Sequence, residues 1–93
     1  MPFISILSDN LKDTIKKLHA KDKQLFLELQ KKMNQIIDCD KDTIKHYKNL
    51  RYDLSDYKRV HIGKSFVLAF SVDVPHNTIV FEKLEHHDKA YKR

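Results

Sequence analysis

The chain has 93 residues, of which 41% are hydrophobic and 33% charged, and it carries a net charge of +5. This length allows one modest core, so we expect a single domain over residues 1–93. We expect a cytoplasmic protein without a membrane partner, because no apolar run could span a membrane, no signal-peptide pattern opens the chain, and the lone Cys39 excludes an internal disulfide.

Apolar periodicity in the first half predicts a strand followed by two helices. Residues 3–7 are apolar and partly alternating, which is typical of a strand. A helix is expected to begin at Ser8-Asp9-Asn10, which supplies N-cap candidates, and a second, longer one after Asp22, which can cap an apolar stripe. The short connection favours an antiparallel hairpin of the two helices. Residues 38–42 interrupt the periodicity and are expected to form a loop.

The second half changes to a period of two, which is typical of strands. Three strands are expected, over residues 57–62, 66–72 and 78–84. Short turns separate them, so the three strands should form an antiparallel meander. The predicted fold is α+β in the order β-α-α-β-β-β, with a two-helix hairpin packed on one face of a small, mainly antiparallel sheet.

Alternation of side chains assigns the two faces of this sheet. Val60 and Ile62 should face the helices, and Arg59 and His61 the open face. On the middle strand the bulkier set should also meet the helices: Phe66, Leu68, Phe70 and Val72. The smaller set should line the open face and leave a hollow there: Val67, Ala69 and Ser71.

Reactive side chains gather beside this open face. The last strand leads into Glu85-His86-His87-Asp88, with Tyr91 close behind, and Lys48 and Arg51 precede the sheet. Histidine suits general acid–base chemistry at neutral pH, and arginine and lysine stabilise charge on a phosphate. This combination of histidines with arginine and lysine is typical of a metal-free ribonuclease, in which His61, His86 or His87 would be the base or the acid. A polar strand end with no reactive role stays an alternative.

Metal binding and nucleic-acid binding are two further properties on which the sequence bears. The spacing of the histidines matches none of the common zinc patterns, so no metal and no other cofactor is expected. The excess of positive charge and five of the six histidines lie in residues 41–93, which suits a nucleic-acid partner. The same charge also suits solubility alone.

Two stretches, YKNLRYDLSDYKRVHIGKSFVLAFSVD and IVFEKLEHHDKAY, resemble the RelE/ParE superfamily of toxins from type II toxin–antitoxin modules. The family pattern is K-x-L, then a tyrosine and RxRIG, then an apolar strand, then HRxxxY. This chain departs from it at three places. His61 replaces the second basic residue of RxR, Val67 stands where an arginine is usual, and His86-His87 replaces the HR pair.

The resemblance implies both a chemistry and partners. RelE-like members cleave mRNA on the ribosome without a metal and leave a 2′,3′-cyclic phosphate, whereas ParE-like members inhibit DNA gyrase. A cognate antitoxin neutralises both types. The chain is therefore expected to be a ribosome-dependent mRNA endonuclease whose partners are the antitoxin, the ribosome and mRNA. A gyrase inhibitor and a domain that only binds antitoxin stay open, because Val67 replaces the usual arginine.

Roles within the expected site follow from the residue types and the family pattern. His87 and His61 are the expected acid–base pair, with the direction left open. The remaining roles are as follows: Arg59 and Lys58 would hold the phosphate, Tyr91 would stack on or orient the substrate, and Lys48 and Arg51 would add to the binding rim. His86 and Asp88 are expected to support the pair, with Asp88 fixing a histidine tautomer.

Overall fold

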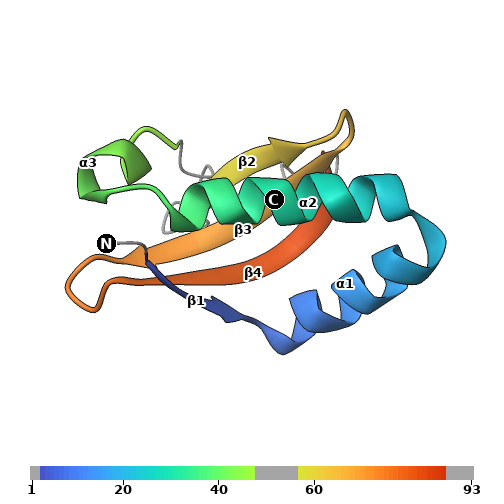
Figure 1. Ribbon diagram of the computed structural model, residues 1–93, viewed down its shortest axis with the longest axis horizontal. Helices are drawn as coiled ribbons and strands as arrows, with labels where there is room; N and C mark the ends of the chain where they lie inside the picture. Colours follow the sequence, from blue (N-terminus) through green and yellow to red (C-terminus); the bar gives the residue numbers. More distant parts are fainter. Residues whose placement is uncertain (1–2, 48–56, 88–93) are drawn as a thin grey trace.

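Figure 1 shows the computed structural model, which describes residues 3–47 and 57–87. The elements follow in the order β1 (Ile4–Leu7), α1 (Asp9–Lys21), α2 (Lys23–Ile37), α3 (Lys41–Ile44), β2 (Lys58–Ile62), β3 (Phe66–Asp73) and β4 (Thr78–His86). The sheet order is β1-β4-β3-β2, in which β1 is parallel to β4 and the other pairs are antiparallel. The predicted fold class is confirmed. Within the described residues, no helix is long and apolar enough to cross a membrane.

Each of the two long helices begins at a residue that was predicted as an N-cap candidate. The hydroxyl oxygen of Ser8 accepts a hydrogen bond from the Leu11 N–H at 3.0 Å and so starts α1. Asp22 serves both helices: its N–H donates to the Leu18 carbonyl at the end of α1, and its carboxylate accepts from the Leu25 N–H at 3.1 Å at the start of α2. Because one residue ends one helix and caps the next, the chain turns sharply between them, as Figure 1 shows.

One short helix was not predicted. Residues 41 and 42, expected within a loop, begin α3. The Asp40 carboxylate caps this helix by accepting from the Thr43 N–H at 2.7 Å, and this hydrogen bonding lowers the pKa of Asp40. Ile44 anchors the helix by inserting into the core. The prediction was wrong here because four residues are too few to show a helical period.

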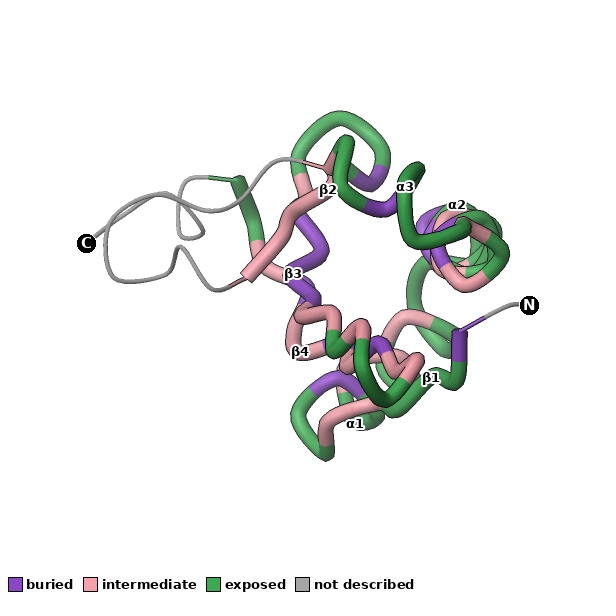
Figure 2. The backbone as a smooth tube through the Cα atoms, turned by 90° about the vertical axis from the view of Figure 1, so that its left-hand side faces the viewer, coloured by how far each residue is buried: buried purple, intermediate pink, exposed green. Residues whose placement is uncertain are grey.

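The core lies between the helices and one face of the sheet. α1 packs against β4 and α2 against β2, and Figure 2 shows buried stretches of the sheet and of α2 turned toward each other. Fully buried side chains from both layers meet there, including Leu11, Leu29, Leu68, Phe70 and Phe81. The predicted core face of β2 and β3 is confirmed.

A bulge in β4 changes the alternation that the sequence suggests. Ala69 on β3 pairs with Lys83, but the next residue, Phe70, pairs with Phe81, so Glu82 is an extra residue on β4. As a result Phe81 and Leu84 both belong to the core, although three positions separate them. Lys83 therefore lies on the face opposite Phe81. Strict alternation would have placed the two on the same face.

Replacing Gly63 with alanine is expected to lower the free energy of unfolding by about 1–2 kcal/mol. Gly63 turns the chain between β2 and β3 with φ of +62°, and a Cβ there would lie 3.0 Å from Oε2 of Glu28. Urea denaturation would measure the loss, with Ser65→Ala in the same turn as the control. Equal midpoints for the two variants would contradict the expected strain.

Candidate active site

The sheet face that points away from the helices carries the candidate site. In the ladder, Arg59 pairs with Ala69 and His61 pairs with Val67. On the other side of β3, Ala69 pairs with Lys83 and Val67 with Glu85. Directly opposed residues share a face. Three strands therefore bring together, on one face, five polar side chains that are far apart in sequence: Arg59, His61, Lys83, Glu85 and, two residues farther along, His87.

His61 and His87 are in direct contact. Their rings stack with centroids 5.5 Å apart and planes inclined by 17°. The His87 N–H donates to the Ser65 carbonyl at 2.6 Å, which holds the chain beside the start of β3 just after β4 ends. Both histidines are exposed. The structure thus brings together the two residues expected to be the acid–base pair.

His86 and Lys58 lie on the other face. The His86 ring packs edge-on against Phe66 with centroids 5.7 Å apart, and the Lys58 ammonium donates to the Tyr47 carbonyl at 3.2 Å. Neighbouring residues of a strand point to opposite faces, so each is directed away from its site neighbour, His87 or Arg59. The structure therefore does not bring Lys58 to the face where it was expected to hold a phosphate with Arg59.

The floor of the site differs from the expected hollow. Val67 and Ala69 were predicted to be open to solvent, but they are 1% and 4% exposed. Longer side chains stand on both neighbouring strands, Arg59 and His61 on one side and Lys83 and Glu85 on the other. Arg59 itself is half-buried, and its Nε atom is fully buried. The site is therefore a set of polar groups above an apolar floor.

The other predicted site residues are Lys48, Arg51, Asp88 and Tyr91, and they lie outside the described residues. Their expected roles stay predictions. Within the described residues, no group of three His, Cys, Asp or Glu side chains could hold a metal ion.

Two features of the site were not predicted. Lys83 and Glu85 form an ion pair across 3.2 Å on the histidine face, and only the bulge at Glu82 places them there. A hollow of about 300 Å³ also lies beside His61, between α2 and the end of β2, and its wall includes Lys31 and Lys32. The sequence shows these lysines only as part of the solvated face of the second helix. It does not indicate that they lie near a histidine of β2.

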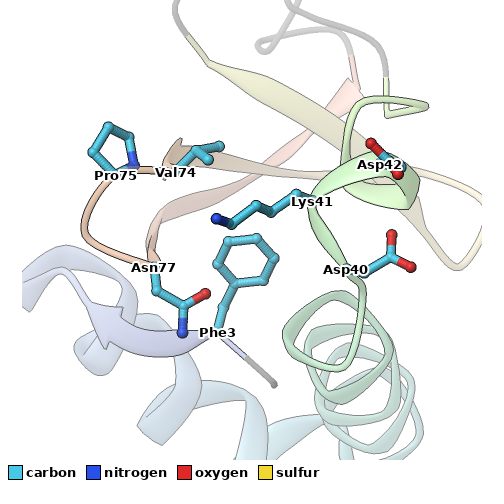
Figure 3. A pocket seen from close by; sticks show the side chains of 7 residues that line it. All are labelled: Phe3, Asp40, Lys41, Asp42, Val74, Pro75 and Asn77. Atoms are coloured by element: carbon cyan, nitrogen blue, oxygen red, sulfur yellow. The ribbon is translucent and has the colours of Figure 1, made fainter.

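A second hollow lies between β1, α3 and the β3–β4 turn (Figure 3). It measures about 500 Å³, and its lining residues are Phe3, Asp40, Lys41, Asp42, Val74, Pro75 and Asn77. Nearby, burial raises the pKa of the Cys39 thiol and of the Tyr47 phenol. Tyr47 packs edge-on against Phe70, on the helix side of the sheet. This region shares no lining residue with the histidine face.

Known proteins resemble this chain in sequence. No protein-family model matches it. A protein of Methanocaldococcus jannaschii named "Putative toxin RelE4" is 44% identical over 84 residues, which cover 90% of this chain and 85% of that protein. The chain belongs to the RelE toxin family. An uncharacterized protein of Methanosarcina mazei is 36% identical to this RelE-family chain over 91 residues, covering 98% of the chain and 100% of the relative.

Solved structures share the fold at low sequence identity. YafQ from Escherichia coli strain BL21(DE3) superposes with a TM-score of 0.72 at 14% identity, covering 95% of this chain and 97% of that one. A chain of the YoeB dimer from Staphylococcus aureus superposes with a TM-score of 0.70 at 16% identity, covering 94% of this chain and 99% of that one. A chain of the toxin–antitoxin complex RelBE2 from Mycobacterium tuberculosis superposes with a TM-score of 0.63 at 17% identity, covering 92% of each chain. These likenesses confirm that the RelE-family chain has the fold of such toxins.

Proposed function

We propose that this RelE-family toxin is an endoribonuclease that cleaves mRNA on the ribosome by acid–base chemistry. The observation that carries the proposal is the contact of His61 and His87, whose rings stack 5.5 Å apart beside Arg59 on an exposed sheet face. Two imidazoles at this separation can bond two different oxygens of one phosphodiester. An arginine on the same face supplies a cation for the phosphate between those oxygens.

The proposed reaction needs only groups of this kind. One histidine, neutral, takes the proton of the ribose 2′-OH while the 2′-oxygen attacks the phosphorus. The other histidine, protonated, gives its proton to the 5′-oxygen as the P–O5′ bond breaks. The products are a 2′,3′-cyclic phosphate and a 5′-hydroxyl. Arg59 would stabilise the additional negative charge on the phosphate oxygens in the transition state.

The partners belong to the same proposal. The Mycobacterium tuberculosis structure is a toxin–antitoxin complex, and we infer that a cognate antitoxin also binds and neutralises this chain. Co-expression with the antitoxin should then restore growth that the toxin alone arrests. The ribosome is the proposed second partner, because it would present the mRNA in an extended, accessible form to a site that is itself a shallow face.

A translating extract tests the proposal. Purified protein is added, and primer extension maps cuts in the mRNA, with the same mRNA without ribosomes as the control. Cuts that need ribosomes and leave 2′,3′-cyclic phosphate ends are expected. A 2′-deoxy substitution at the cut nucleotide should abolish cleavage there, because the attacking oxygen is gone. Intact mRNA together with blocked DNA supercoiling in a gyrase assay would replace the proposal with gyrase inhibition.

A further inference from the structure

A lysine that no sequence pattern singled out stands across the sheet from Arg59. Arg59 on β2 and Lys83 on β4 both pair with Ala69 on the intervening strand. Strands in a sheet lie about 4.8 Å apart, so the Cα atoms of Arg59 and Lys83 are about 10 Å apart. The small Ala69 side chain lies between them. Two long cationic side chains therefore flank one buried alanine on the same face as His61 and His87.

We propose that Lys83 binds an RNA phosphate together with Arg59, an inference that rests on the proposed nuclease function. The Lys83 side chain is 40% exposed and that of its partner Glu85 is 30% exposed, so both are partly open to solvent. A partly exposed lysine can offer its ammonium to an incoming phosphate oxygen while its aliphatic stem packs against the protein. Lys83 thus supplies the second cation for the phosphate on this face. Lys58 was expected in that role but is directed to the other face.

Glu85 acts in this arrangement as the counter-ion of Lys83 in the absence of RNA. The ion pair spans 3.2 Å and holds the ammonium over the face. Partly exposed pairs of this kind contribute little net free energy, so a phosphate can compete with the carboxylate for the ammonium. Removing the lysine and removing the carboxylate should consequently have opposite effects on RNA affinity. A purely structural ion pair would make the two changes similar.

The bulge at Glu82 is what makes the arrangement possible. It moves Lys83 to the face opposite Phe81 and leaves Glu85 following it at the next alternate position on that face. His87, just after the strand, meets His61 there. The chain therefore presents a lysine and a carboxylate along β4 and a histidine just after it, across β3 from the arginine and histidine of β2. Lys83 lies level with Arg59 in the sheet. His61 and His87 meet farther along the same face, where the proton transfers are proposed.

The test measures binding of a single-stranded RNA with 2′-O-methyl groups, which cannot be cleaved, by fluorescence anisotropy over a series of salt concentrations. Each phosphate contact on a single strand contributes about 0.7 to the slope of log affinity against log salt. Lys83→Met is expected to reduce the slope by about that amount, and Lys83→Arg to keep it. Glu85→Gln is expected to raise the affinity. Lys17→Met, an exposed lysine on α1, is the matched control and should leave the slope unchanged.

The outcomes separate this inference from the nuclease proposal. A reduced slope for Lys83→Met in a protein that cuts no mRNA would support the lysine and overturn the nuclease. Equal slopes and affinities for Lys83→Met and Lys17→Met would overturn the lysine whatever the cleavage result. A wild-type slope near zero would overturn it as well, because no phosphate would then be held.

Discussion

Replacing His87 with alanine is expected to slow mRNA cleavage by roughly 10²–10⁴-fold, the usual cost of losing a general acid or base. His61→Ala should have an effect of the same order, because each ring is proposed to move one of the two protons. Primer extension in the translating extract, with the toxin sampled over time, gives the rates. Binding of uncleavable RNA should fall far less than the cleavage rate in either variant, which places most of the loss in the chemical step.

The double variant sharpens this prediction. Residues that act as one unit have strongly non-additive effects, so removing both histidines should cost little more than removing one. His46→Ala is the matched control, since His46 is exposed after α3 on a different part of the molecule. Full activity in His87→Ala, or the same loss in His46→Ala, would show that the stacked pair is not the acid–base pair.

Replacing Leu29 with alanine is expected to lower the free energy of unfolding by about 2–5 kcal/mol. Leu29 is 1% exposed and belongs to the core where α2 meets the sheet. Removing its buried carbons forfeits their transfer free energy and leaves a cavity. A domain of this size has about 5–15 kcal/mol of stability in total, so a large part would be lost. Urea denaturation at constant pH measures the change.

Leu27→Ala on the same helix is the control for this change. Leu27 is 56% exposed, and substitutions on such surfaces usually stay within about 0.5 kcal/mol. The same atoms are removed from the same helix in both variants, so helix propensity cancels and only burial differs. Midpoints that shift equally would mean that α2 does not pack against the sheet as the structure has it.

Much of the fold could be predicted from local patterns. Ser8 and Asp22 cap helices because their side chains accept backbone N–H groups within three residues, an interaction that the local sequence contains in full. The period-two pattern around Val60 and Leu68 likewise predicted which side of each strand faces the core. Local patterns missed α3, whose stability depends on Ile44 reaching a core built by distant residues.

The candidate site, like the fold, could be predicted in part from local patterns. Each strand taken alone supplies the kinds of side chain available: an arginine and a histidine at alternate positions of one strand, and paired histidines after another. Their alternation placed Arg59 with His61, because a strand side-chain period of two is a property of the local backbone. The same period, applied to Lys58, would have kept that residue out of the phosphate site where it was expected.

Which of these groups meet depends on how the strands pair in three dimensions. The ring contact of His61 and His87 depends on the register of two antiparallel pairings through β3, and register is set by contacts between strands. The bulge at Glu82 likewise depends on contacts between strands. The sequence of β4 permits either face for Lys83, and the packing of Phe81 and Leu84 into one core selects the face that carries the histidines.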